Sequence, residues 1–567
     1  MTLARHDAPA ASLPDTRPGK GPVNIAAQLT AMAARYPDKR AVVWTAGRDA
    51  SGRARYADVT FAALEQETDR YAYGLEHVGV TRGTRTIVFL TPGPDFFALV
   101  FALFKVGAVP VMIDPGIGRR QMRMCLAAVR GEAFIGVPRA HVFRTLYPGS
   151  FRSVRVAVTV GRRWFWGGLR RADIRSDPWR RYEPVPTTEH DPAAILFTSG
   201  STGPAKGVLY EHGMFDAQVR YLHSHFGYSA EDVDLPTFPL FALFDVALGM
   251  TAVIPEMDFS RPGSVEPSKI IEPIGDHGVT HMFGSPALLD RVSRYGEAHG
   301  TTLPTLERVV TAGAPVPPAV LERMHAMLGP EAEVHTPYGA TEALPVASIG
   351  SREILGDTAE RTKRGAGTCV GVPMDGLDVR IIRIDDAAIA NWSDDLELPA
   401  GDIGEITVTG SVVTRTYHND PGATALAKIA HGSSTRHRMG DVGYVDGTGR
   451  LWFCGRKAHR VVTRTGTLFT VPCEAMFNQH PRVCRSALVG IGEAGRQLPV
   501  ICIQLEGDDT GADTAALTRE LLTLAAADAR TREITTLLFH QAFPVDARHN
   551  SKIVREKLAI WAKEQVR

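Results

Sequence analysis

Apolar residues recur at helical spacing in two segments near the start of the chain, residues 24–36 and residues 60–78. Asn24 and Thr60 stand at the first positions of these segments, and short polar side chains of this kind favour helix N-termini. We therefore expect two amphipathic helices, each with one face against a core.

The hydrophobic pattern then alternates between strand and helix. Residues 86–90 and 108–113 have the length and composition of buried strands, and residues 95–105 between them have the pattern of a helix. This sequence of elements is typical of parallel βαβ units in a doubly wound α/β sheet. Lys105 and Pro110 interrupt the most apolar stretch, which is too short to span a membrane and which we interpret as a buried helix leading into a strand.

In the last third of the chain the pattern changes twice. Residues 379–454 contain short alternating segments with Gly and Pro turns, such as 404–409 and 449–453, which predict a small barrel-like subdomain. From residue 474 onward strand and helix patterns alternate, and residues 551–566 predict a final helix.

Composition narrows the class of protein. A chain of 567 residues is too long for one compact core, so two or more domains are expected. The formal net charge is +1, which gives no general reason to expect nucleic acid as a partner.

Six scattered cysteines form no Cys-x-x-Cys pair, which favours a reducing cytoplasm over a disulfide framework or a structural zinc site. Residues 1–22 lack an apolar signal region and are predicted to be a disordered extension.

One segment departs sharply from this average composition. Residues 162–181 contain seven arginines and three of the seven tryptophans of the chain. We interpret the segment as a solvated loop whose tryptophans pack on the body of the protein. A surface that docks a partner or a membrane is the main alternative, and nucleic acid binding is the least favoured.

A glycine-rich loop follows the predicted strand 193–196. Residues 197–207 read Phe-Thr-Ser-Gly-Ser-Thr-Gly-Pro-Ala-Lys-Gly, in which glycines expose backbone N–H groups, hydroxyls add donors and a lysine adds positive charge. This chemistry indicates a phosphate-binding loop, with a flexible surface turn as the alternative. The spacing does not fit the Walker pattern. The candidate anion-binding residues are Thr198, Ser199, Gly200, Ser201, Thr202, Gly203 and Lys206.

Residues 198–207 resemble the signature loop of the adenylate-forming superfamily, which includes acyl-CoA ligases, luciferases and the adenylation domains of peptide synthetases. The resemblance implies that the enzyme activates a carboxylate with ATP, in the presence of Mg²⁺, and forms an acyl-adenylate and pyrophosphate. The family's other motifs follow in the expected order along nearly the whole chain.

The second motif is Tyr-Gly-Ala-Thr-Glu at residues 338–342. By resemblance Tyr338 stacks on adenine beside Gly339, Thr341 bonds the α-phosphate and Glu342 holds Mg²⁺. An aromatic face suits a purine, and a carboxylate suits a hard cation bound to phosphate oxygens.

Two further segments complete the expected nucleotide site. Gly313, Ala314 and Pro315 follow a predicted strand at 306–310, and small residues there let adenine lie against backbone. Asp441 matches the family's aspartate that binds the ribose hydroxyls, a task for an acceptor-only side chain.

The resemblance also identifies a hinge and a mobile lysine. Arg456 lies in a Gly-Arg-Lys segment that is similar to the hinge between the family's two domains, and Lys457 and His459 are both candidates for the pivot. Lys552 matches the lysine that stabilises negative charge between the carboxylate and the α-phosphate, so Lys552 is expected to be catalytic together with Thr341 and Glu342.

The acyl pocket is expected from an aromatic stretch after residue 236. Its predicted lining is Phe238, Phe241, Ala242, Phe244 and Gly284. Family members often carry histidine where Ala242 stands, so this chain favours an apolar acyl chain. For any single ring, a place in the structural core is an equally reasonable interpretation.

The implied fold is α/β, with a large N-terminal domain of two doubly wound sheets and a small β-barrel-like subdomain, followed by a smaller, mobile α+β C-terminal domain. The expected domains are residues 1–22 as an extension, 23–454 as the adenylation domain with its barrel-like subdomain at about 375–454, and 455–567 as the lid.

At closer range, residues 236–245 and 545–552 resemble the β-lactone synthetase of bacterial long-chain olefin biosynthesis. This implies a 2-alkyl-3-hydroxy fatty acid whose own hydroxyl attacks the adenylated carbonyl, without CoA. Residues 461–469 also depart from the pattern that shapes the thiol tunnel in CoA ligases. A long-chain acyl-CoA ligase and an inactive nucleotide-binding interaction protein are the alternatives. The implied partner enzymes are a reductase, a β-lactone decarboxylase and a thiolase-like condensing enzyme.

Overall fold

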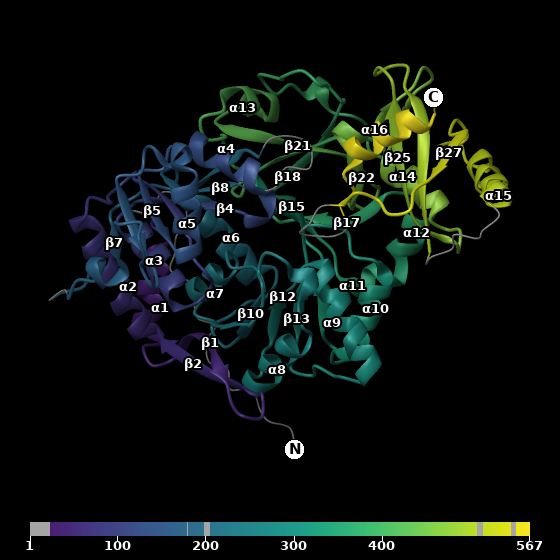
Figure 1. Cartoon of the computed structure of the whole chain (residues 1–567). Helices are drawn as coiled ribbons and strands as arrows, with labels where there is room; N and C mark the ends of the chain where they lie inside the picture. The colour runs from purple at the N-terminus through teal and green to yellow at the C-terminus, as the bar shows by residue number, and fades with distance from the viewer. Residues whose placement is uncertain (1–22, 178–179, 198–204, 507–513, 546–551, 567) are drawn as a thin grey trace.

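The computed structural model describes residues 23–177, 180–197, 205–506, 514–545 and 552–566. Figure 1 shows two neighbouring α/β lobes, with an antiparallel sheet and the yellow-green C-terminal lobe above them. The first lobe is mostly purple to blue, and the second is mostly blue to teal with a purple hairpin at its edge.

The first lobe is built on a sheet of seven described strands. The strands are parallel, except for the last strand at one edge, which is antiparallel to its neighbour. In spatial order the strands are β7 (Leu169–Arg170), β6 (Val156–Thr159), β5 (Ala133–Gly136), β3 (Arg85–Phe89), β4 (Val109–Ile113), β8 (Pro192–Phe197) and β9 (Gly207–Glu211). Helices α2 (Phe61–His77) and α3 (Pro94–Lys105) pack on the inner face, and α4 (Arg119–Val129) and α5 (Pro138–Leu146) cover the outer face.

The second lobe repeats this design with seven described strands, parallel except for the pair β1 and β2. Their order is β14 (Glu333–His335), β13 (Arg308–Val310), β12 (His281–Phe283), β10 (Val233–Pro236), β11 (Thr251–Ile254), β1 (Arg40–Arg48) and β2 (Ala54–Thr60). The helices of this lobe and its border are α1 (Ala26–Arg35), α6 (His212–Ser224), α7 (Ala242–Leu248), α8 (Ser268–His277), α9 (Pro286–His299) and α10 (Pro318–Met327). One continuous hydrophobic core joins the two lobes through α1, α3, α6 and α7.

An antiparallel sheet lies over the junction of the two lobes. Its described strands run β15 (Tyr338–Ala340), β16 (Ala343–Ser348), β17 (Thr368–Pro373), β22 (Leu451–Arg456), β21 (Ser434–Val445), β19 (Gly404–Thr409) and β18 (Asp378–Ile382), with β20 (Lys428–His431) paired to β21. Short helices α11 (Ser351–Glu353), α12 (Ala359–Lys363) and α13 (Pro421–Ala427) connect them. The sheet therefore begins with the Tyr338 motif itself.

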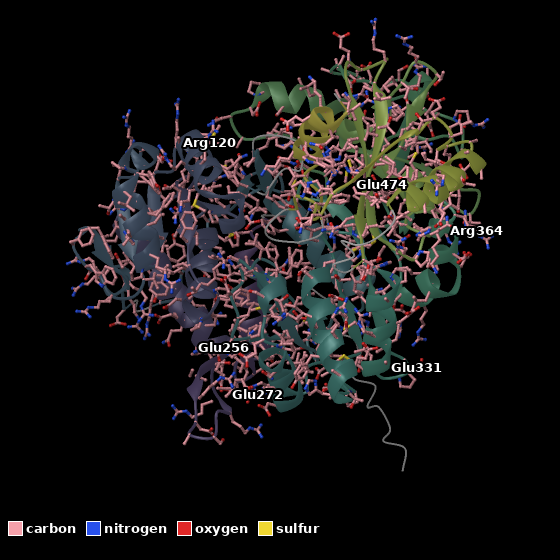
Figure 2. The ribbon with its side chains drawn as sticks, turned by 45° about the vertical axis from the view of Figure 1, so that its right-hand side comes forward. Arg120, Glu256, Glu272, Glu331, Arg364 and Glu474 are labelled. Atoms are coloured by element: carbon pink, nitrogen blue, oxygen red, sulfur yellow. The ribbon has the colours of Figure 1, made fainter. Side chains whose placement is uncertain are left out.

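The C-terminal lobe is a small α+β unit. It contains a hairpin of β23 (Val461–Val462) and β24 (Thr467–Leu468), a sheet of β25 (Val483–Ile491), β26 (Leu498–Leu505) and β27 (Thr536–Phe539), and helices α14 (Thr470–Phe477), α15 (Thr514–Ala527) and α16 (Arg555–Gln565). Figure 2 shows Glu474 within this lobe and Arg364 at its border with the teal lobe. At this border the Arg530 guanidinium donates to the carbonyl oxygens of Arg364 and Gly365, at 2.7 and 2.5 Å.

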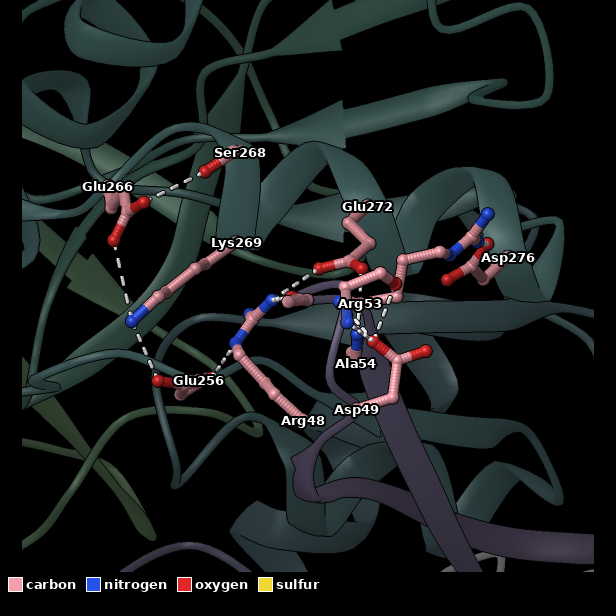
Figure 3. Close-up of polar contacts among 12 residues, drawn as sticks. Arg48, Asp49, Arg53, Ala54, Glu256, Glu266, Ser268, Lys269, Glu272 and Asp276 are labelled. Carbon is pink, nitrogen blue, oxygen red and sulfur yellow. Dashed lines mark hydrogen bonds and ion pairs between the residues drawn. The ribbon is translucent and has the colours of Figure 1, made fainter.

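Ion pairs fix the edge hairpin of the second sheet to the neighbouring helix α8. Arg48 lies 3.0 Å from both Glu256 and Glu272, and Lys269 of α8 approaches Glu256 to 2.7 Å, as Figure 3 shows. The hairpin edge is thus covered by charged side chains, which hinders pairing with another chain.

Most of the predicted elements are confirmed. The expected helices at 24–36, 60–78 and 95–105 correspond to α1, α2 and α3, and the Thr60 hydroxyl accepts a hydrogen bond from the Ala63 N–H as the expected cap. The final helix begins only at Arg555, because residues 552–554 run in an extended connection before it. Within the described residues, no helix is both long and apolar enough to cross a membrane.

Candidate functional site

The predicted phosphate loop connects two paired strands at the carboxyl edge of the first sheet. Strands β8 and β9 are antiparallel, with Phe197 opposite Gly207, so the loop between them starts and ends at one point. Thr198, Ser199, Gly200, Ser201, Thr202 and Gly203 lie outside the described residues. A Cβ at Gly207 would approach the Phe197 ring to 2.7 Å, so the close return of the chain here needs glycine.

Among the candidate anion-binding residues, Lys206 belongs to the described part of the chain. Its ammonium lies over the ring of Tyr417, 5.0 Å from the ring centre, a cation–π arrangement. Lys428, which is buried, approaches the same ring to 5.8 Å. Burial lowers the pKa of Lys428 to about 7, an effect that the charge of Glu342 partly opposes.

Glu342 is held by contacts from a distant segment. The Tyr417 hydroxyl donates to Glu342 Oε1 at 2.6 Å, and both the backbone N–H and the hydroxyl of Thr414 donate to the Glu342 carbonyl oxygen. The carboxylate is therefore fixed at one oxygen beside the lysine of the phosphate loop.

Thr341 and Gly339 lie in the same tight turn. The Tyr210 hydroxyl donates to the Thr341 carbonyl oxygen at 2.6 Å, which ties the motif to β9 directly after the phosphate loop. A Cβ at Gly339 would meet the Ala343 carbonyl oxygen at 2.6 Å, so the turn from β15 to β16 requires glycine there.

Tyr338, Asp441 and Arg456 form a second cluster. The Tyr338 hydroxyl donates to Asp441 Oδ2 at 2.7 Å, and Arg456 Nη1 lies 2.8 Å from Asp441 Oδ1. Asp441 and Arg456 are direct partners across β21 and β22. Burial raises the pKa of Asp441, and the charge of Arg456, the Tyr338 hydrogen bond and the charge of Lys552 oppose that rise.

The two clusters are parts of one site. The Asp441 carboxylate raises the pKa of Arg456, and Glu342 contributes to the same rise. Lys552 comes from the C-terminal lobe yet acts on Asp441. The structure thus brings together Lys206, Tyr338, Glu342, Asp441, Arg456 and Lys552.

Gly313, Ala314 and Pro315 follow strand β13 at the carboxyl edge of the second sheet. Gly313 has a φ of 97°, which favours glycine. The Thr311 N–H donates to the His335 carbonyl oxygen, so this loop lies beside the chain that leads into Tyr338. Gly313 and Pro315 are exposed.

The predicted acyl-pocket residues divide into two groups. Phe238 and Phe241 are half-buried, with ring centres 5.0 Å apart. Ala242, Phe244 and Gly284 are buried, and Phe244 packs against Phe215 in the core between the lobes. The first group is thus partly accessible to solvent, whereas the second group is enclosed by the protein.

The hinge candidates occupy different positions. Lys457 forms an ion pair with Glu405 at 3.0 Å on the side of the large domain. His459 Nε2 lies 3.2 Å from Glu556 Oε1 at the start of α16. Beyond His459, Arg460 pairs with Asp386 of the large domain at 2.6 Å, so contacts with the large domain and with the C-terminal lobe overlap across residues 457–460.

Four residues that shape the site were not predicted from the sequence. Tyr417, Tyr210 and Lys428 surround Glu342 and the phosphate-loop lysine, and Phe283 completes an aromatic triad, with its ring 4.6 Å from Phe241 and 6.3 Å from Phe238. One sequence feature could have drawn attention to Tyr417, namely its position shortly before an Asn-Asp-Pro turn, but by itself this feature is weak evidence for a site residue.

The donor set suits a nucleoside triphosphate. Cationic groups at Lys206, Arg456 and Lys552 match phosphate charge, and the Tyr338 ring offers a face to a purine. The buried Asp441 carboxylate at the centre can accept hydrogen bonds from two neighbouring hydroxyls.

Comparisons with known proteins agree with this chemistry. Residues 29–418 match the model of the AMP-binding enzyme family. The chain is 49% identical over 558 residues to the olefin beta-lactone synthetase of Stenotrophomonas maltophilia, covering 96% of this chain and 99% of that protein.

Solved structures share the fold. The amide bond synthetase McbA of Marinactinospora thermotolerans superimposes with a TM-score of 0.75 at 22% identity, over 95% of this chain and 99% of that one. The O-succinylbenzoate coenzyme A synthetase of Bacillus subtilis, solved with ATP and a magnesium ion, gives a TM-score of 0.70 at 18% identity, over 94% and 98% of the two chains. This chain belongs to the AMP-binding enzymes, the adenylate-forming family whose motifs its sequence carries.

Proposed function

We propose that the protein is a β-lactone synthetase that activates a long-chain 2-alkyl-3-hydroxy fatty acid with ATP and then closes it to a β-lactone. The observation that carries the proposal is the near full-length similarity to an olefin beta-lactone synthetase. The cluster of Tyr338, Asp441, Arg456 and Lys552 supports the shared first step, because it presents the groups that bind a nucleotide.

In the first step a carboxylate oxygen of the acid attacks the α-phosphorus of ATP, the bond to the β-phosphate oxygen breaks and pyrophosphate leaves. Lys552 stabilises the negative charge that develops between the carboxylate and the α-phosphate, and Thr341 donates a hydrogen bond to that phosphate. Asp441 accepts from the ribose hydroxyls, and Tyr338 stacks on the adenine beside residues 313–315.

We further propose a Mg²⁺ site at Glu342. Tyr417 engages only one oxygen of this carboxylate, Oε1, so the other oxygen can turn toward a cation. Bound there, Mg²⁺ would supply positive charge to the phosphate oxygens. Lys206 and the residues of the phosphate loop share the task of binding those oxygens.

In the second step the 3-hydroxyl oxygen attacks the adenylated carbonyl carbon. The new C–O bond closes a four-membered ring, the bond to the AMP oxygen breaks, and the hydroxyl proton is lost as AMP leaves. Because nucleophile and electrophile belong to one molecule, neither CoA nor a carrier protein is needed. What the chain must supply is a pocket that holds the two groups together and excludes water.

The aromatic triad of Phe238, Phe241 and Phe283 fits the apolar part of this substrate. The three rings lie within 4.6–6.3 Å of one another at the ends of β10 and β12, the carboxyl edge of the second sheet. Ala242 adds no polar group behind them. We therefore place the alkyl chains against these rings.

The test is to incubate the purified protein with MgATP and a synthetic 2-alkyl-3-hydroxy acid, with and without CoA, and to identify the product by NMR. We expect a β-lactone in both reactions. A matched acid without the 3-hydroxyl is the control, and it should release pyrophosphate but give no lactone. A thioester formed only with CoA would identify an acyl-CoA ligase instead, and absence of pyrophosphate with every acid would indicate an inactive nucleotide-binding protein.

This reaction requires chemistry on either side of it. The acid must come from condensation of two acyl chains followed by ketone reduction, and loss of CO₂ from the lactone would give an olefin. We accordingly propose a thiolase-like enzyme, a reductase and a β-lactone decarboxylase as the partner enzymes.

A further inference from the structure

The positive charge of the chain is concentrated in one stretch. Residues 115–172 contain twelve arginines and a single acidic residue, Glu132, although the whole chain has a formal net charge of only +1. The arginines are Arg119, Arg120, Arg123, Arg130, Arg139, Arg144, Arg152, Arg155, Arg162, Arg163, Arg170 and Arg171. Such an asymmetry indicates a surface that meets negative charge.

The fold places this stretch on the outer side of the first lobe. Helices α4 and α5 pack on the sheet face that points away from the second lobe, and Arg123 of α4 lies over the Tyr147 ring at the end of α5, 4.6 Å from its centre. Figure 2 shows Arg120 at the outer edge of this lobe, away from the C-terminal lobe that carries Glu474. We call α4, α5 and the loop of residues 160–168 the basic face.

Neighbouring carboxylates neutralise little of this charge. Of the twelve arginines, only Arg170 and Arg171 form ion pairs with carboxylates of the described residues, namely Asp173 and Asp95. Arg162 and Arg163 are exposed in the loop after β6. The positive field of the basic face therefore extends into solvent.

The basic face also exposes apolar side chains. Within the described part of the chain, four of the ten large hydrophobic residues with high exposure belong to it. They are Met124 at 52%, Leu146 at 66%, Trp164 at 56% and Phe165 at 73%. Trp166 meets the expectation that the tryptophans of this segment pack on the protein, whereas Trp164 packs one side against Trp166, with ring centres 5.4 Å apart, and leaves most of its surface exposed. Trp179 lies outside the described residues.

Trp166 fixes the loop that presents the two exposed rings. Its indole stacks on His141 of α5 with ring centres 5.3 Å apart, its N–H donates to the Thr159 hydroxyl at 3.0 Å, and its carbonyl oxygen accepts from Arg144 at 3.2 Å. The exposed rings of Trp164 and Phe165, whose centres each lie 5.4 Å from that of Trp166, therefore rest on an anchored base, which lowers the entropy lost on insertion into a partner.

We propose that the basic face docks the enzyme on an anionic lipid bilayer. Arginines beside exposed aromatic rings suit the headgroup region, where guanidinium groups meet lipid phosphates and the rings enter the acyl boundary. Met124 and Leu146 favour lipid over nucleic acid, because aliphatic side chains give no face for base stacking. The idea that docking delivers a lipid-soluble acid to the active site rests on the proposed function. The binding of the basic face to lipid does not.

The experiment measures sedimentation of the full-length protein with vesicles, without substrate or ATP. We expect binding to vesicles with about one third phosphatidylglycerol, little binding to pure phosphatidylcholine, and release at about 0.5 M salt. The double variants Trp164→Ser/Phe165→Ser and Arg162→Gln/Arg163→Gln should each weaken binding about tenfold or more. Leu524→Ser and Arg496→Gln, exposed residues of the C-terminal lobe, are the matched controls and should bind like the wild type.

Equal binding to neutral and anionic vesicles, or undiminished binding by both double variants, would overturn the proposal. So would tight binding to single-stranded RNA or to polyglutamate with none to anionic vesicles, which would identify a nucleic acid or an acidic protein as the partner. Adenylation of a detergent-dispersed acid by the same variants shows that they are folded, and loss of vesicle binding with adenylation intact separates this inference from the catalytic one.

Discussion

The Tyr417 hydroxyl donates a hydrogen bond to Glu342 Oε1 at 2.6 Å across 75 residues of sequence, while the ring of the same tyrosine faces the ammonium of Lys206 at 5.0 Å. One side chain therefore aligns both the proposed Mg²⁺ ligand and the lysine of the phosphate loop. This makes Tyr417 a positioning residue for two groups that act on the phosphates.

Replacement of Tyr417 by Phe should separate these two tasks. The variant keeps the ring beneath Lys206 but loses the hydrogen bond to Glu342, so we expect the Mg²⁺ concentration for half-maximal pyrophosphate release to rise about tenfold. Titration of ATP by calorimetry, with and without Mg²⁺, gives a readout independent of turnover. Tyr417→Leu removes the ring as well and should weaken ATP binding even without Mg²⁺. An unchanged Mg²⁺ dependence in Tyr417→Phe would show that the hydroxyl does not position Glu342.

The role of Asp441 can be tested with the nucleotide itself. An acceptor-only carboxylate that bonds both ribose hydroxyls should discriminate against 2′-deoxy-ATP, and Asp441→Asn should lose most of that discrimination. We expect KM for ATP to rise by about tenfold or more in the variant, with KM for 2′-deoxy-ATP changing less. If the ratio of the two KM values stays as in the wild type, Asp441 supports the site only through Arg456 and Tyr338.

Lys552→Ala should abolish adenylation while leaving ATP binding largely intact. The ammonium is proposed to act on charge that develops in the transition state, so we expect pyrophosphate release to fall by about a hundredfold or more. Lys557→Ala is the matched control, since it removes the same group from an exposed position in α16. Calorimetry with ATP measures binding. Equal turnover by the two variants would remove the assigned role from Lys552.

Local patterns predicted the parts of this site but not the way they meet. Thr60 and the helix that it caps, the strand before the phosphate loop and the Tyr338 motif could all be predicted from a few consecutive residues. The hydrogen bond from Tyr338 to Asp441 spans 103 residues and depends on the register of β21 against β22. Such contacts are set by tertiary packing, which single-sequence patterns do not encode.

Local sequence patterns also do not predict that Asp234 of β10 and Asp245 of α7 form a buried pair of carboxyl groups. Burial raises the pKa of Asp234 to about 7, and burial together with the nearby Asp234 raises the pKa of Asp245. Each group thus binds its proton more tightly in the folded state than in the unfolded chain, where the ordinary value is 3.8. The stability that protonation gives is complete below pH 3.8 and is lost as the pH rises toward and through about 7.

Thermal unfolding from pH 5 to 8 tests this dependence. A group that is protonated in the folded state and ionised in the unfolded state lowers the free energy of unfolding by roughly 1.4 kcal/mol for each unit by which the pH rises. In Asp245→Asn the amide cannot ionise and can still donate to Asp234, so the pair no longer places two negative charges side by side. We expect the Tm of this variant minus the Tm of the wild type to increase as the pH rises from 5 to 8. Parallel Tm curves for the two proteins would mean that the pair does not hold a proton in the folded state.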